Sequence, residues 1–294
     1  MKPLAGMVAS TILCGLAISS LHAQNIEDMV SKYTEANGEG YLQPLADAVG
    51  ANLNSGLFQT ARIPTTGFYI RGNLVVMLAP IGDDNKTFTA TTEPPFSPTQ
   101  TAEAPTVFGD TDPVSVIGTG GTEYVFPGGF AINRFPFLVP HIAIGSIRGT
   151  EVMFRYFQLT PDDNIGKIKL FGFGARHSIS QYLEEPPLDL SASFFFQTFD
   201  IGDIVEANTT IFGLQGSYTK SVLTLYGGPG IETSSLDIAY DFEDTQIRFN
   251  MDGENSFRFT AGASADLLIL RLFIEYNFAS QSALALGIGL GSVI

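Results

Sequence analysis

The sequence is poor in cysteine, tryptophan, histidine and basic residues. It has one Cys, Cys14, no Trp, three His, and 15 Lys and Arg against 30 Asp and Glu in 294 residues. Cys14 falls within the leader described next, so neither disulfides nor thiol chemistry is expected in the mature chain. The formal net charge of −15 argues against nucleic acid as a partner.

Long hydrophobic runs are missing after residue 23 as well. No window there shows the ~18 consecutive apolar residues that a membrane helix needs. Residues 1–23 combine Lys2, an apolar stretch and the small Ala23, a pattern typical of a secretory signal peptide. The sequence therefore predicts an exported chain, cleaved near Ala23, that would cross a membrane only with strands.

Patterns for catalysis and metal binding are scarce. Only His141 and His177 follow the leader, too few for a histidine metal cluster, and no cofactor is expected. His177 and Ser178 are adjacent, so on a strand they point to opposite faces and cannot form a nucleophile–base pair. The chain has no Gly-x-Ser-x-Gly elbow, and its acid pairs at 109–112 and 161–164 lack the spacing of a calcium loop. We therefore do not expect an enzyme.

Alternation of apolar and polar residues is abundant. The 24 Phe, 10 Tyr and 31 Gly favour strands and turns over helices. Most of the alternating segments reach the ~9 to 11 residues that a tilted membrane strand requires. Twelve strands are predicted, at about 67–80, 137–146, 150–159, 166–179, 189–200, 208–219, 221–230, 234–242, 245–252, 255–265, 267–278 and 282–294.

Two regions depart from this alternation. Residues 24–64 are expected to be helical or irregular and to plug the lumen of a barrel, with a short amphipathic helix ending at Gly38 or Gly40. Residues 82–132 hold seven acids and one base, together with many Pro, Thr and Gly. This composition predicts a long, acidic, solvated loop that contains a short hairpin at 114–126.

Charged residues inside apolar strands indicate which face of the sheet points into the lumen of a barrel. In residues 256–278 the apolar positions are odd up to Ala265 and even from Leu268, so the phase flips as it does in a tight hairpin. The charged residues then share one face. An Arg facing lipid at mid-depth would cost ~2 to 4 kcal/mol, so in a membrane barrel these charges should face inward. The candidate lumen residues are Glu151, Arg155, Asp237, Asp241, Arg248, Arg258, Asp266, Arg271 and Glu275.

Two architectures share this alternation. In a soluble sandwich the apolar face would be buried in the core and the charges would face water. In a membrane barrel the apolar face meets lipid and the charges line the interior. Long strands that meander to their sequence neighbours, an exported chain, and one long loop opposite very short turns favour the barrel. We predict an all-β, antiparallel, up-and-down transmembrane barrel over residues 65–294, with 12 strands, or 14 if the acidic loop adds a hairpin to the barrel.

Two segments carry a resemblance to known proteins. "ADAVGANLNSGLFQTARIPTTGFYI" (46–70) and "GARHSISQYLEEPPLDLSASFFFQTFDIGD" (174–203) resemble an uncharacterised family of exported barrels known as a domain of unknown function. In the order of its segments the chain is also similar to the outer-membrane transporters of fatty acids and other hydrophobic compounds. Those transporters are plugged by a segment containing Asn-Pro-Ala, which this chain lacks.

The resulting functional hypothesis is an outer-membrane barrel of a Gram-negative bacterium. It would passively transport or bind small hydrophobic or amphipathic compounds. The alternative is a structural or assembly-partner barrel without transport, with the acidic loop as its docking surface. Expected partners are outer-membrane lipid, the barrel-assembly machinery and a small hydrophobic ligand.

Overall fold

Ten antiparallel strands close into a barrel. The structure is a computed structural model that describes residue 33 and residues 35–160, 167–242 and 245–293, so the predicted signal peptide lies outside the described residues. The sheet order is β10-β9-β8-β7-β6-β1-β15-β14-β13-β11, and β10 also pairs with β11 to close the ring. The barrel strands are β1 (Tyr69–Pro80), β6 (Arg134–Ile147), β7 (Thr150–Leu159), β8 (Ile168–Ser178), β9 (Asp189–Ile201), β10 (Val205–Lys220), β11 (Leu223–Phe242), β13 (Phe257–Leu267), β14 (Leu270–Phe278) and β15 (Ala283–Val293).

The alternation of the sequence sets the two faces of this wall. On β14, Ile274 is half exposed on the outside, whereas its neighbours Phe273 and Glu275 are buried inside. Successive side chains of a strand point to opposite faces, so each strand contributes one inner and one outer row. The prediction of an antiparallel all-β barrel is confirmed.

The predicted count of 12 or 14 barrel strands is wrong, because β11 runs through residues 231–233, where a turn was expected. These residues, Ile-Glu-Thr, contain no Gly, Pro, Asn or Asp to favour a turn. The Glu232 N–H donates to the Ser256 carbonyl at 3.0 Å, and the Gly253 N–H donates to the Ser234 carbonyl at 2.9 Å. These bonds keep β11 extended, and β12 (Thr245–Asp252) pairs with its far half outside the closed ring.

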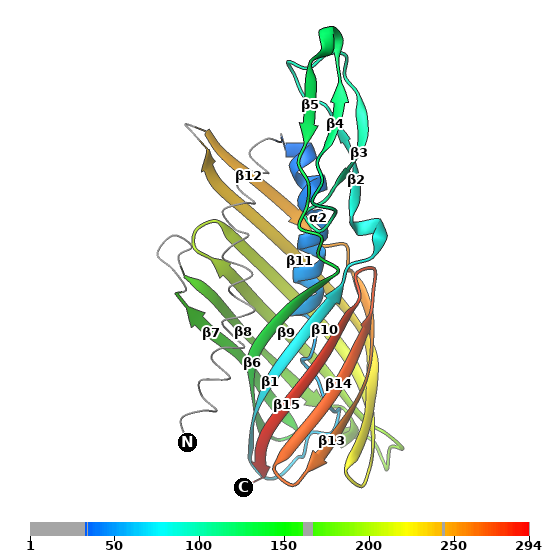
Figure 1. The fold of residues 1–294 in the computed structure, drawn as a ribbon. Helices are drawn as coiled ribbons and strands as arrows, with labels where there is room; N and C mark the ends of the chain where they lie inside the picture. Colours follow the sequence, from blue (N-terminus) through cyan, green and yellow to red (C-terminus); the bar gives the residue numbers. More distant parts are fainter. Residues whose placement is uncertain (1–32, 34, 161–166, 243–244, 294) are drawn as a thin grey trace, which may run out of the picture.

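Helix α2 (Glu35–Leu53) starts at the level of β12 and runs down into the barrel (Figure 1). The expected helix end at Gly38 or Gly40 is therefore wrong. A Cβ on Gly38 would lie 2.1 Å from the ring of Phe249, and one on Gly40 would lie 2.6 Å from the ring of Phe88. These glycines allow strands to pack closely on the helix and do not end it. Among the described residues, no helix is both long and apolar enough to cross a membrane.

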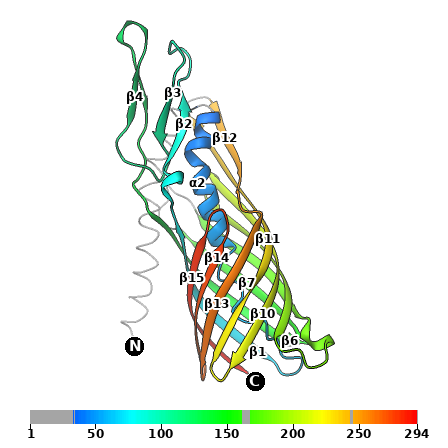
Figure 2. The ribbon, with the colours of Figure 1, turned by 90° about the vertical axis from the view of Figure 1, so that its right-hand side faces the viewer.

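The acidic segment 82–132 forms two hairpins that stand beyond one end of the barrel (Figure 2). The strands β4 (Val114–Ile117) and β5 (Glu123–Phe126) form the predicted hairpin, while the pair β2 (Thr87–Thr91) and β3 (Thr101–Pro105) was not predicted. Short 3-10 helices lie at Asp83–Asn85, Thr119–Gly121 and Ser180–Tyr182. Neither hairpin joins the wall, so the segment adds no barrel strand.

One seam interrupts the wall. β6 and β7 are paired from His141↔Arg155 down to their turn, and no pairing between them continues above this point in the described chain. Both strands nevertheless continue, and each keeps its other neighbour. A seam between residues 134–140 and 156–159 therefore opens at the hairpin end of the barrel.

Candidate functional site: the filled lumen

Two wall arginines hold the chain that follows α2. Arg155 donates to the carbonyl of Leu53 at 2.8 Å and to that of Ser55 at 2.7 Å. Arg258 donates to the Asn54 carbonyl at 2.8 Å. Both guanidinium groups are buried, and each satisfies peptide carbonyls that the end of a helix leaves free. The lumen charges thus bind the protein's own backbone.

Glu275 binds the next peptide group. Its carboxylate accepts a hydrogen bond from the Gly56 N–H at 2.8 Å and another from the Asn277 amide at 2.9 Å. Gly56 has φ +66°, and a Cβ on it would lie 2.5 Å from Val75. Only glycine suits both that backbone conformation and that approach to the wall. The chain therefore turns at Gly56, where Glu275 of β14 binds its N–H.

Further down, the segment stays bound to the wall as far as residue 64. The hydroxyl of Ser217 accepts the Ala61 N–H at 2.9 Å, and the hydroxyl of Ser264 donates to the Gln59 carbonyl at 3.0 Å. Ser146 donates to the Pro64 carbonyl. These contacts come from β10, β13 and β6, so residues 51–64, which we call the plug, run down the lumen.

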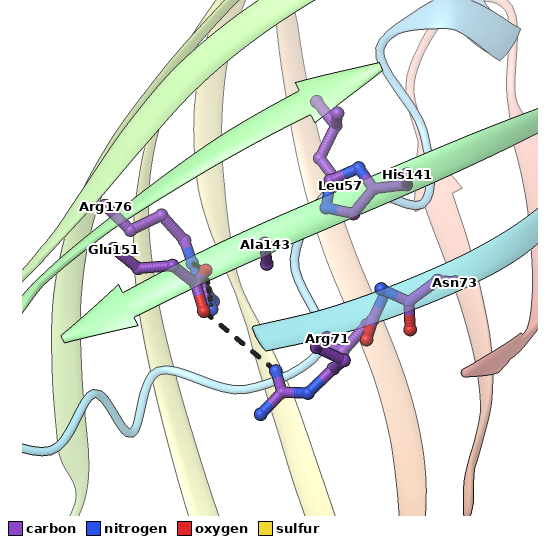
Figure 3. Close-up of a pocket in the computed structure, with 8 residues that line it drawn as sticks. Leu57, Arg71, Asn73, His141, Ala143, Glu151 and Arg176 are labelled. Carbon is purple, nitrogen blue, oxygen red and sulfur yellow. Dashed lines mark hydrogen bonds and ion pairs between the residues drawn. The ribbon is translucent and has the colours of Figure 1, made fainter. Parts of the chain in front are cut away.

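Figure 3 shows the charged cluster beside the lower plug. Arg176 contacts one carboxylate oxygen of Glu151 at 2.6 and 2.8 Å, and Tyr69 donates to the other oxygen at 2.5 Å. Arg71 lies 4.0 Å from the same carboxylate. The hollow lined by Arg71, Glu151 and Arg176, and by Leu57, Gln59, Asn73, His141 and Ala143, has no space as large as a water molecule.

The upper lumen has a different chemistry. Leu42, Val49 and Leu53 of α2 belong to a buried apolar cluster that includes Val139, Leu170 and Phe199 of the wall. Phe137 and Phe199 pack edge to face with their ring centroids 5.0 Å apart. The lumen thus has an apolar upper level around α2 and a polar lower level around the plug.

Asp47 of α2 is a buried acid between Leu42 and Val49 of this cluster. Burial raises the pKa of its carboxyl group, while hydrogen bonds from the Glu254 N–H and the Gln43 amide act in the opposite direction. The first of these bonds is 2.9 Å long and ties α2 to the segment between β12 and β13. The helix is thus tied to this segment at Asp47 and to the wall by Arg155 at its C-terminal end.

The structure separates the nine predicted lumen residues into three groups. Glu151, Arg155, Arg258, Arg271 and Glu275 are buried inside the barrel, and Asp266 lies partly exposed at the rim, where it pairs with Arg271 at 2.5 Å. Asp237 and Arg248 lie on the outer face, because Leu236, Ile238 and Phe249 take the inner one. The side chain of Asp241 lies outside the described part.

The inverted faces of β11 and β12 have a physical cause. Here the wall rises beside α2, so its inner face meets an apolar helix. The outer row of β11 changes from the exposed apolar Leu225 and Ile231 to Thr233, Ser235 and Asp237 along the strand. Alternation alone fixes which residues share a face of the sheet but not which face points inward. The sequence therefore placed Asp237 and Arg248 correctly on one shared face, but that face points outward and not into the lumen.

The sequence argument missed several polar groups that bind the plug or its arginines, among them Arg176, Gln197, Glu232 and Asn277. Arg176 shares its parity with Gly172 and Gly174, the small inner row of β8, which was a usable signal. Glu232 was missed because a turn was expected at its position. It pairs with Arg258 at 2.6 Å, and both side chains are buried.

His177 and Ser178 lie on opposite faces of β8. The His177 ring bonds with Thr150 at 2.8 Å and with Tyr182 at 2.8 Å, whereas Ser178 is buried. The two side chains therefore do not form a nucleophile–base pair. Within the described ranges, no group of three or more His, Cys, Asp or Glu is placed to hold a metal ion.

Comparison with known proteins gives one family match. Residues 1–292 match a family of unknown function, DUF6588, which confirms the resemblance seen in residues 46–70 and 174–203. No curated protein matches the chain.

Three solved structures illustrate the similarity in fold, each at low identity. The outer membrane protease OmpT from Escherichia coli is 8% identical, with 79% of this chain and 98% of that chain covered and a TM-score of 0.34. The Ralstonia pickettii toluene transporter TbuX is 8% identical, with coverages of 86% and 99% and a TM-score of 0.27. Neisserial surface protein A is 9% identical, with coverages of 78% and 98% and a TM-score of 0.23.

Proposed function

The chain belongs to the DUF6588 family, whose function is unknown, and we propose that it is an outer-membrane barrel that binds or passes small hydrophobic or amphipathic compounds. In this proposal the plug keeps the lumen closed to ions and water. The compound occupies the apolar upper lumen around α2 and reaches it through the seam between β6 and β7. No catalytic step is assigned to the chain.

The outer surface of the barrel supports a membrane location. Large apolar side chains on neighbouring strands are 40 to 61% exposed there, whereas the arginines of the same strands are inside. A belt of this extent is unfavourable in water and favourable in lipid. The belt includes Val152, Phe154, Phe173, Phe212, Ile231, Ile274 and Leu286.

The seam is the observation that carries the proposed access route. The Asn133 carbonyl accepts the Ile81 N–H at 3.0 Å, so the peptide group of Asn133 faces β1. Peptide groups alternate in direction along a strand, so those of even-numbered β6 residues face β7. Two of these residues, Pro136 and Pro140, have no N–H to donate. The sequence of β6 thus disfavours closing the ladder at this edge.

The seam also connects suitable surfaces. On its inner side, Val139, Phe137 and Phe157 belong to or pack against the apolar cluster around α2. On its outer side, Tyr156 is exposed and is the last apolar residue of the outer row of β7, because the next residue of that row is the polar Gln158. A hydrophobic molecule moving between lipid and the upper lumen would meet apolar side chains along this path.

Cross-linking of the seam tests the access route. If the ladder continued, Leu138 would lie opposite Gln158, just as Ile142 lies opposite Phe154 lower down. Cys14 is the only cysteine of the sequence and lies in the predicted leader, so engineered pairs should react without competition. We expect the pair I142C and F154C to form a disulfide, and the pair L138C and Q158C to need a longer bifunctional reagent, because disulfides require Cα atoms within ~7 Å.

The functional readout is entry of a hydrophobic fluorescent dye into vesicles that carry the protein. Bridging residues 138 and 158 should reduce entry to the level of vesicles without protein, while the disulfide between residues 142 and 154 should leave it unchanged. Dye entry that persists after complete bridging of the seam would contradict the proposed route.

A scaffold role is the second candidate. It is favoured by the depth at which α2 and the plug are buried, which suits a permanently closed barrel. In this reading the two hairpins dock a partner, such as a component of the barrel-assembly machinery.

Deletion of residues 86–125 separates the two candidates. Asn37 donates to the Thr91 carbonyl at 2.7 Å, and Tyr41 accepts the Val107 N–H at 3.0 Å, so the hairpins hold α2 in place. Under the binding proposal we expect the deletion to alter dye entry, measured in the same vesicles. Loss of a co-purifying partner with unchanged dye entry would instead favour the scaffold.

A further inference from the structure

The turns at the end of the barrel opposite the two hairpins share an unusual backbone conformation (Figure 1). The β6–β7, β8–β9, β10–β11 and β13–β14 turns each contain one non-glycine residue with positive φ: Arg148 at 49°, Glu185 at 42°, Ser221 at 58° and Leu268 at 60°. This conformation disfavours side chains with a Cβ and is most often taken by Gly, Asn or Asp. Three of the four residues are polar, and Leu268 is the exception.

Leu268 is also the most exposed large apolar residue described. Its exposed fraction is 103%, and its neighbours Leu267 and Ile269 are 46% and 63% exposed. If the tip faced water, Gly or Asn at position 268 would both lower the backbone strain and be better solvated than Leu. The sequence Leu-Leu-Ile at this tip therefore fits an apolar environment outside the protein.

The tip belongs to a larger patch. The Asp266 N–H donates to the Val222 carbonyl at 2.8 Å, which holds the β10–β11 turn beside the β13–β14 turn. Val222 and Leu223 are 44% and 58% exposed. We call the set Val222, Leu223, Leu267, Leu268 and Ile269 the turn patch. It continues without a polar gap into Leu225 and Leu272 of the apolar belt.

We propose that the turn patch is immersed in the lipid leaflet at this end of the barrel. The proposal rests on the membrane location proposed above. Its continuity with the belt favours lipid over a protein partner, because one apolar phase then covers both surfaces. One peptide group of the tip is already paired within the protein, since the Ile269 carbonyl accepts the Gly291 N–H at 3.0 Å, which reduces the cost of placing the turn in lipid.

The consequence is a tilted barrel. In the ring of strands, the turns that contain Arg148 and Glu185 flank the position opposite the β13–β14 turn. Ile147 and Tyr182 beside them are exposed and apolar, but the exposed charges of Arg148 and Glu185 belong in water, whereas residues 267–269 carry no charge. The side of the barrel formed by β11, β13 and β14 therefore sits deeper in the membrane than the side formed by β6, β7 and β8.

Spin labels on single cysteines test this arrangement in lipid vesicles. L268C reports on the patch, and R148C is its matched control, an exposed residue with positive φ in the opposite turn. I274C is the reference within the belt. Collisions with a water-soluble nickel chelate should be about tenfold rarer at L268C than at R148C, because transfer of a polar chelate from water into hydrocarbon is unfavourable. Oxygen collisions at L268C should approach those at I274C.

Each outcome decides between the two proposals. If L268C meets nickel as often as R148C while I274C is protected, the turn lies in water, and the immersion proposal is overturned with the membrane location intact. If I274C is also open to nickel, the membrane location itself fails. Protection at V222C equal to that at L268C would extend support to the whole turn patch.

Discussion

Deleting residues 24–64 is expected to convert a barrel that conducts no ions into one that conducts. The plug binds inner groups of β6, β7, β10, β13 and β14, and the hollow around Arg71, Glu151 and Arg176 beside it has no space as large as a water molecule. Without it, Arg155, Arg258 and Glu275 lose their peptide partners and must be hydrated. Buried charges are costly without partners, so water and ions should fill the lumen.

Single-channel recording in a planar bilayer measures this change. The intact chain should give a flat baseline and the deletion variant discrete conductance steps. Far-UV circular dichroism serves as the folding control, since the barrel strands all lie outside the deleted segment. Comparable steps from the intact chain would show that the plug does not close the lumen. A folded deletion variant that stays silent would show that the wall collapses on itself.

The faces of residues 256–278 could be predicted because local alternation decides them. A tight hairpin preserves the inside–outside relation between its strands, and a buried Arg or Glu has few alternatives to the lumen. The placement of Arg258, Arg271 and Glu275 inside the barrel required only this short-range rule.

The faces of β11 and β12 depended on a long-range contact. Whether Leu236 and Phe249 point inward depends on α2, which lies about two hundred residues earlier in the sequence. The length of the helix depends on long-range contacts as well. Gly38 and Gly40 look like helix ends in the sequence, whereas in the structure they leave room for the rings of Phe249 and Phe88. A single sequence carries no direct signal for that contact. It also carries none for the plug partners of Arg155, Arg258 and Glu275, because these partners are backbone peptide groups.

Replacing Arg258 with Met is expected to lower the free energy of unfolding by about 3 to 5 kcal/mol. The variant loses the bond to the Asn54 carbonyl and leaves Glu232 as a buried acid without its partner at 2.6 Å. Arg134 provides the matched control, because it is an exposed arginine at the start of β6, and R134M should change stability by less than about 0.5 kcal/mol.

The double variant R258M with E232L isolates the cause of that loss. Replacing a buried ion pair by apolar groups of similar size is often close to neutral, so E232L should restore most of the stability lost in R258M. Urea titration of the protein in lipid vesicles, followed by tyrosine fluorescence, gives the four free energies of the cycle. If the double variant is as unstable as R258M alone, the loss comes from the plug carbonyls rather than from the unpaired acid. Arg258 would then act mainly as an anchor for the plug, and R258M should also produce the conductance expected of the deletion.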